Sequence, residues 1–148
     1  MIDRATEIRG KIFDALSDLE HSGVQIPVFD EFVNPNVTLP SVEGALSVYV
    51  VIQDQQEMMS PIQTVCNPRF ELNVTIRVVT TWGTVGSKKL CEDIGNEIMY
   101  KLKDDTGSSK ITGIDKVTLV SARSLAESTS SNLAFSKIII LKFEKNGN

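Results

Sequence analysis

Residues with reactive side chains are few in this chain, and none stands in a catalytic pattern. The one histidine, His21, follows a helix-type segment, and we interpret it as a surface residue near a helix C-terminus. No serine or cysteine lies in a nucleophile motif. The carboxylates are scattered along helix faces and turns, a pattern typical of solvated surfaces. The sequence therefore predicts a protein that is not an enzyme and holds no metal or cofactor.

The two cysteines, Cys66 and Cys91, lie far apart and lack the spacing of metal ligands. The N-terminus carries charge from its third residue and shows no apolar leader core, so we expect no signal peptide and synthesis in a cytoplasm. In that compartment the two cysteines are expected to be free thiols, with a disulfide between them as the alternative.

A segment with the sequence GTVGSKK, residues 83–89, could cradle an anion. It follows a strand pattern and opens a helix pattern, and a bound anion at Gly86, Ser87 and Lys88 would complement the helix dipole. The segment lacks the spacing of a phosphate-binding loop. The alternative is that its lysines form ion pairs with Glu92 and Asp93 one turn later.

Four basic residues lie on strand patterns: Arg69, Arg77, Arg123 and Lys137. One interpretation is exposed charge that protects sheet edges from pairing. The other is that Arg69, Arg77 and Arg123 contact a neighbouring subunit or partner, because a small domain with so many apolar strand residues often shares its sheet with another chain. Both interpretations stay open at this level.

Length and charge narrow the class of protein. The chain has 148 residues, of which 41% are hydrophobic, which fits one domain spanning residues 1–148 and no membrane span. Its net charge is −4 and its pI about 5.0, whereas nucleic-acid binders usually carry a basic excess.

Hydrophobic periodicity predicts two helices and five strands. The helices are expected at residues 3–20 and 87–103, where apolar residues recur at the helical period. The strands are expected at 24–30, 47–53, 69–82, 116–126 and 133–144. Residues 69–78 alternate strictly between apolar and polar. We expect residues 104–113 to form a flexible linker.

This order, α-β-β-β-α-β-β, predicts the fold class. Strands joined by loops rather than by helices favour antiparallel pairing. We therefore expect an α+β domain with a mostly antiparallel sheet of four to five strands and two helices packed on one face. Pro27 removes a backbone donor, which places the first strand at an edge.

The segment between the second and third strands, residues 57–68, is longer and more apolar than a strand connection needs. We expect Met58, Met59 and Ile62 in it to touch another chain, since methionine adapts well to partner surfaces. The alternative is that these residues and Val65 fold back as a small core of their own.

The order of elements resembles the bacteriophage tail terminator and head–tail joining (neck) proteins. The resemblance is carried by an N-terminal amphipathic helix, EIRGKIFDALSDL, followed by IPVFDEFV and the strand VYVVIQDQ. It continues through RFELNVTIRVVT, the helix KKLCEDIGNEIMYKL and the closing strands KVTLVSARSLAES and FSKIIILKFE. It covers nearly the whole chain as a pattern and includes no single diagnostic motif.

The resemblance implies a structural virion protein. Such proteins form a homo-oligomeric ring, commonly a hexamer, at the head-proximal end of the phage tail. They end growth of the tail tube and join the tail to the neck, with the tail tube protein and the connector proteins as partners and DNA as passing cargo. It implies a place in the virion tail or neck after assembly in the host cytoplasm. The rival reading is an independent ligand-binding or regulatory α+β domain that uses the anion site.

Overall fold

The protein is an α+β domain, as predicted. A computed structural model describes residues 4–31, 33–59, 69–129 and 131–146. The elements in chain order are α1 (Arg4–Ala15), β1 (Glu20–His21), β2 (Val24–Gln25), β3 (Val28–Asp30), β4 (Ser47–Met59), β5 (Arg69–Trp82), α2 (Lys89–Leu102), β6 (Lys116–Ser128) and β7 (Leu133–Asn146).

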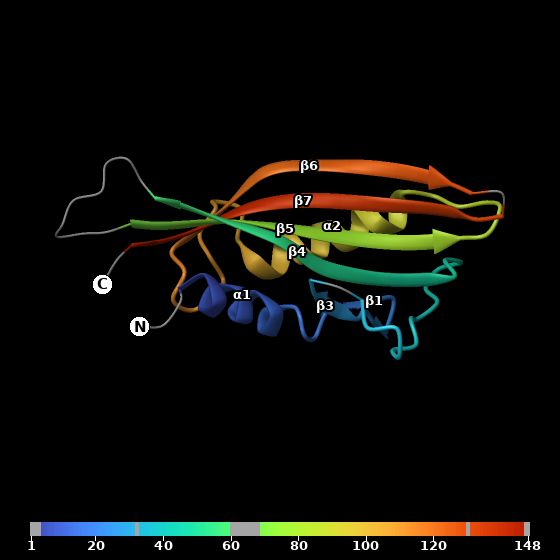
Figure 1. Ribbon diagram of the computed structural model, residues 1–148, viewed down its shortest axis with the longest axis horizontal. Coiled ribbons are helices and arrows are strands. Elements are labelled where there is room, and N and C mark those ends of the chain that lie inside the picture. Colours follow the sequence, from blue (N-terminus) through green and yellow to red (C-terminus); the bar gives the residue numbers. More distant parts are fainter. Residues whose placement is uncertain (1–3, 32, 60–68, 130, 147–148) are drawn as a thin grey trace.

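The main sheet has the strand order β3-β4-β5-β7-β6 (Figure 1). The short strand β3 runs parallel to β4, and every other neighbouring pair is antiparallel. Strand β5 is central and pairs along its full length with β7. The sheet is long and narrow, and α2 lies along the middle of it while α1 lies beside β4 (Figure 1).

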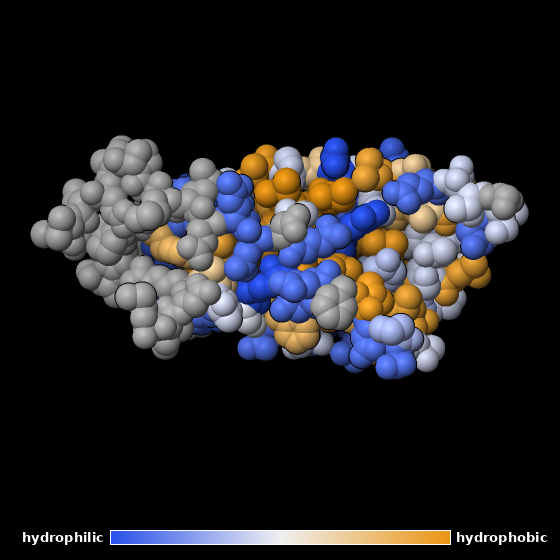
Figure 2. Space-filling view, viewed as in Figure 1, coloured by the Kyte–Doolittle hydropathy of each residue, from blue (hydrophilic) through white to orange (hydrophobic). Residues whose placement is uncertain are grey.

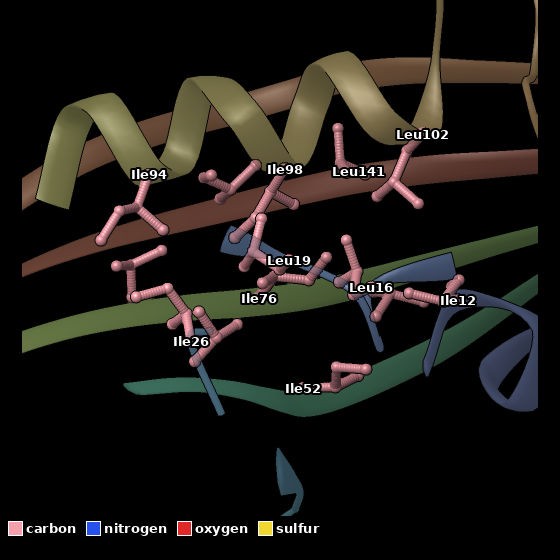
Figure 3. Close-up of a cluster of buried hydrophobic side chains, with 14 of the residues drawn as sticks. Ile12, Leu16, Leu19, Ile26, Ile52, Ile76, Ile94, Ile98, Leu102 and Leu141 are labelled. Carbon is pink, nitrogen blue, oxygen red and sulfur yellow. The ribbon is translucent and has the colours of Figure 1, made fainter. Parts of the chain in front are cut away.

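The hydrophobic core fills one face of this sheet. The even-numbered residues of β5 point to the helices because side chains alternate along a strand, and Leu72, Val74, Ile76 and Val78 are fully buried. Helix α2 covers them with residues at helical spacing, among them Ile94, Ile98 and Leu102 (Figure 3). Ile12 of α1 and Leu16, just after that helix, add to the same cluster. Both helices therefore lie on the same face, as predicted.

A buried arginine fastens α1 to the sheet. Arg9 forms an ion pair with Asp30 of β3, and its guanidinium also donates to the carbonyl oxygens of Ile52, at 2.5 Å, and Gln53, at 2.8 Å. These carbonyls lie where β3 stops pairing with β4 and where the β4–β5 register shifts. The Ile52 carbonyl also accepts the Glu31 amide at 2.8 Å, so Arg9 adds a second donor there and satisfies the Gln53 carbonyl beyond the end of β3, a role that needs a multi-donor side chain.

The N-terminal third departs from the predicted elements. Helix α1 ends at Ala15 rather than near residue 20, and the predicted strand 24–30 is divided into β2 and β3. Strands β1 and β2 form a tight hairpin whose turn needs positive φ at Ser22 and Gly23. Gly23 therefore serves this turn rather than a helix end. Pro27 separates the two pieces of the strand, and β3 lies at the sheet edge as expected.

Strand β4 is longer than predicted, and this changes the placement of two methionines. It continues to Met59, with a register shift between Ile52 and Gln55. Met58 and Met59 therefore belong to the strand, level with Glu71 and Phe70 of β5, and not to a loop. Polar residues at 53–57 concealed the strand because this part of it extends past the helices. Ile62, Val65 and Cys66 lie outside the described residues.

The expected flexible linker at 104–113 is an ordered turn. Burial of Ile111 and Ile114 against the core anchors it. The Asp104 carboxylate accepts hydrogen bonds from the side chain and backbone of Thr106 and from the Ser108 backbone, which lowers the pKa of Asp104. The polar composition correctly indicated turns but not the two apolar anchors.

Substitutions in β5 should separate its two faces. Leu72→Ala removes a fully buried side chain and should cost about 2–5 kcal/mol of unfolding free energy. Thr75→Ala, on the uncovered face of the same strand, should change it by less than about 0.5 kcal/mol. Urea unfolding followed by circular dichroism measures both. Equal effects would contradict the assigned strand phase.

Candidate interaction surface

The face of the sheet opposite the helices is uncovered in the chain that the structure describes. We call it the open face. It is built from side chains that alternate with the core residues of β4, β5, β7 and β6. Figure 2 shows this side of the molecule as hydrophobic patches interspersed with hydrophilic residues. The apolar and aromatic members of the open face are Phe29, Tyr49, Val51, Val79, Leu125, Ile138 and Ile140.

The central row of the open face alternates apolar and basic side chains across the strands. Strand pairing places Val51, Arg77, Ile138 and Arg123 side by side on β4, β5, β7 and β6. Side chains directly opposite one another in adjacent strands are in contact range, about 4.5–5.5 Å between Cβ atoms. Arg77 and Arg123 thus flank Ile138, so the structure brings together two of the predicted contact residues that are distant in sequence.

Arg77 is a partly buried charged group near the middle of the open face. Its side chain is 27% exposed, and one guanidinium nitrogen donates to Ser136 at 3.2 Å and lies 3.7 Å from Glu127. Its Nε atom is buried without a hydrogen-bond partner. A guanidinium suits contact with the carboxylates or aromatic rings of another chain.

The other predicted contact residues lie elsewhere. Arg69 begins β5, eight positions before Arg77 and level with Asn146, so it belongs to the far end of the sheet. Met58 and Met59 are paired with the same end of β5. Lys137 points to the helix side, where its side chain approaches Gly95 of α2, and so it is not part of the open face.

The candidate anion site is occupied by the chain's own groups. The α2 N-cap is Lys88 rather than Ser87, and the Ser87 hydroxyl accepts the Lys89 amide. Lys89 pairs with Asp93 at 3.2 Å, as the alternative interpretation expected. Gly86 packs so tightly on the Trp82 ring that a Cβ there would lie 2.5 Å from it. The glycine therefore serves packing against tryptophan rather than approach to a ligand.

His21 is not the simple surface residue that was expected. Its imidazole is 12% exposed, and Nδ1 lies 2.6 Å from Glu97 of α2. Nε2 lies 3.3 Å from Glu43, though not in hydrogen-bonding geometry. Burial alone would lower the pKa of His21, but the hydrogen bond and charge of Glu97, with help from Glu43, outweigh burial and raise the pKa above its ordinary 6.5. Only the fold brings these three segments together.

The contacts of His21 and Asp18 take the place of an ion pair within α2. Glu97 and Lys101 are spaced to pair within α2, but Glu97 binds His21 and Lys101 binds Asp18 at 3.0 Å. Both partners come from the segment after α1, so these two contacts fasten α2 to the β1–β2 hairpin. Tertiary partners win because a pair between exposed residues one helical turn apart contributes only about 0.3–0.5 kcal/mol.

The rest of the described surface offers no enclosed site. Two shallow hollows of about 540 and 250 Å³ flank Tyr100 on the outer side of α2. The Lys110 ammonium lies 3.6 Å from the centre of the Tyr100 ring.

Within the described residues no cluster of His, Cys, Asp and Glu could hold a metal ion. Cys91 is a buried free thiol, and burial raises its pKa.

Comparisons with known proteins do not identify the chain. No protein family model matches it, and no curated protein matches it significantly in sequence. Among the described residues, no helix has the length and apolar character needed to cross a membrane.

The His21 contacts predict a pH dependence of stability. A raised pKa in the folded state means that this stabilisation is complete below about pH 6.5 and is lost as pH rises through the folded-state pKa. The difference in unfolding free energy between the wild type and His21→Gln should therefore be larger at about pH 6 than at about pH 8.5. Urea unfolding at both pH values measures it, and Glu97→Gln should reduce the same difference.

His21 is the only histidine in the chain, so the comparison isolates one group. A difference between wild type and variant that stays constant over this range would contradict the assigned contacts.

Proposed function

We propose that this chain is a structural assembly protein that forms a homo-oligomeric ring through its sheet. The observation that carries the proposal is the open face, a sheet surface that no described element covers. On it lie two arginines and five partly exposed apolar or aromatic side chains: Phe29, Tyr49, Leu125, Ile138 and Ile140. Sheets of two-layer domains often face water with polar outer residues, and on this face polar side chains such as Asn73, Thr75 and Ser121 surround the apolar ones. The outer residues of β7 include Ile138 and Ile140, which water does not favour.

The composition of the open face suits a protein interface. Aromatic residues and arginine are enriched at the energetically important centres of protein interfaces, and here Tyr49, Phe29 and Arg77 lie among aliphatic side chains. Phe29 and Tyr49 contact edge to face with ring centres 6.3 Å apart, which fixes their orientation before any partner arrives. A preorganised surface loses less conformational entropy on association.

We further propose that the ring is that of a phage tail terminator or head–tail joining protein. The support is the sequence resemblance in the order and character of the elements, to which the α+β fold adds a compatible architecture. In this role the ring ends the growth of the tail tube, joins tail to neck and leaves a channel for DNA. The acidic pI suits such a channel, because a surface that does not bind phosphate lets DNA pass.

The rival proposal, an independent domain that binds an anion at the start of α2, has less support. The Ser87 hydroxyl accepts the Lys89 amide and the Lys89 ammonium pairs with Asp93, so two polar groups at the start of α2 already have partners within the chain.

Ring formation is testable by native mass spectrometry over a range of concentrations, alone and with tail tube protein. The wild type should form one closed oligomer, and Ile138→Ser/Ile140→Ser should weaken it, because the change removes apolar surface at the centre of the open face. Tyr100→Ser is the matched control, since it removes a more exposed apolar side chain on the helix side. Circular dichroism checks that each variant folds. A wild type that stays monomeric under all conditions would refute the proposal.

The conduit role predicts that the protein does not hold DNA. A gel-shift assay with duplex DNA at about 0.15 M salt should show no complex, because the net charge of −4 opposes phosphate. Sub-micromolar binding would overturn this part of the proposal while leaving ring formation intact.

A further inference from the structure

Strand β6 has a long free edge. Its first residues are covered, since Ser108 pairs with Lys116 and the Val117 amide donates to Gly107. From Thr118 to Ser128, no other described strand lies on the side away from β7. This leaves an edge of about eleven residues, although most strands are only about 5–6 residues long.

The backbone donors along this edge point outwards. The Leu133 amide donates to Gly83, and the Thr129 amide donates to Asn132. Bonded and non-bonded pairs alternate along an antiparallel ladder. The register of β6 with β7 therefore turns alternate amides of β6 away from the sheet: Ala122, Ser124, Ala126 and Ser128.

The edge carries some of the usual protection against pairing, in the charges of Arg123 and Glu127. The edge has one bulge at Val120 and contains no proline. Leu119 and Val120 are 40% and 51% exposed, and the hollow between Leu119 and Tyr100 lies beside them. An added strand would cover these side chains, and main-chain hydrogen bonds would hold it in place.

The opposite side of the same sheet offers a matching edge. Strand β3 pairs with β4 only as far as Ile52, and Arg9 occupies the carbonyl oxygens of Ile52 and Gln53. Beyond them, residues 54–59 of β4 continue as a strand with no described neighbour on that side. Among the described residues, the sheet therefore has two free edges on opposite sides.

Strand direction makes these two edges complementary. The sheet from β4 to β6 contains an even number of antiparallel strands, β4, β5, β7 and β6, so its two outer strands run in opposite directions. When two copies stand side by side with their helices on the same face, β6 of one copy meets β4 of the next in antiparallel orientation. Such a head-to-tail contact uses two different surfaces and can close into a ring.

We propose that the ring is held by strand addition between copies, with the β6 edge of one copy pairing with residues 54–59 of β4 in its neighbour. This inference rests on the proposed ring and specifies the surfaces that form it. The partner is a second copy because the same chain supplies an edge of the required direction, face and spacing.

Pairing of Ser124 with Gln55 of the neighbour places residues 120–125 of β6 opposite residues 54–59 of β4. Ser124 is level with Val78 of β5, and Gln55 is level with Val74. The copies are therefore staggered by four residues, or about 13 Å along the strands. A stagger of this kind accompanies the strand tilt that closes a sheet. Both side chains then lie on the helix side.

A cysteine pair tests this contact directly in the full-length chain. In a Cys66→Ser background, Ser124→Cys with Gln55→Cys should give a ladder of disulfide-linked oligomers on oxidation, because opposed residues in adjacent strands lie within disulfide range. Ser124→Cys with Gln56→Cys is the matched control, since neighbouring residues of a strand point to opposite faces. It should give at least tenfold less cross-linking. Equal cross-linking by both pairs, or none by either, would overturn the assigned pairing.

Edge variants give an independent measurement by native mass spectrometry. Ala122→Pro removes an outward amide, and Val120→Lys places a charge on the edge, so each should abolish the oligomer. Val85→Lys, at an exposed valine in the 83–87 loop, should leave it unchanged. If Ala122→Pro fails to fold by circular dichroism, Val120→Lys decides. A wild-type ring that survives a folded edge variant would refute edge pairing but keep the proposed function, whereas a monomeric wild type would refute both.

Discussion

The alternation of side chains along β5 is the constraint from which the rest of the structure follows. Each residue of a strand faces the side opposite to its neighbours, so a sheet always has two faces to satisfy. Two helices of 12 and 14 residues are enough to cover one face of a five-stranded sheet. They do so with the even-numbered residues of β5 beneath them. The odd-numbered residues, Arg77 at their centre, are left on the open face.

The edges of the sheet are treated unequally. On one side, the first half of β4 is closed to further pairing. The short β3 pairs with it, Pro27 lacks a backbone donor, and Arg9 binds its carbonyl oxygens. On the other, β6 keeps a long row of outward amides, and beyond Arg9 the end of β4 does the same. Edge pairing is a hazard that monomeric proteins suppress. A chain that closes one part of an edge and leaves the complementary parts open has the arrangement that directed head-to-tail assembly requires.

The two proposed contacts use different physical chemistry and serve different ends. Main-chain pairing at the edges is directional and fixes the relative position of neighbouring copies. Edge pairing leaves the open face uncovered, so apolar contact there is a separate, less directional contact that contributes free energy in proportion to the area removed from water. The polar cluster of His21, Glu43 and Glu97 lies on neither surface. It fastens α2 to the hairpin and the 42–45 turn, and so belongs to the stability of the single chain.

The sequence by itself determined the fold class, both helices and the long strands β5, β6 and β7, because strong periodicity over ten or more residues leaves one consistent burial pattern. Weaker sequence patterns gave the wrong local structure at the end of β4 and in the 104–113 turn. The polar end of β4 was taken for a loop, although pairing with β5 makes it a strand whose residues extend past the helices. The buried anchors Ile111 and Ile114 were hidden in a polar turn. Local periodicity reports which residues are buried within an element and carries little information about short elements held by distant partners.

For the candidate surface the division is similar. The sequence identified Arg77 and Arg123 as residues with a role on the sheet, because charge on an apolar strand pattern calls for exposure or a partner. Only the tertiary structure decided that they share one row, that Arg69 and Lys137 do not join it, and that His21 lies between two carboxylates. Strand order, register and the meeting of segments far apart in sequence are set by the packing of the whole chain. That packing depends on long-range contacts, for which a local pattern provides no signal.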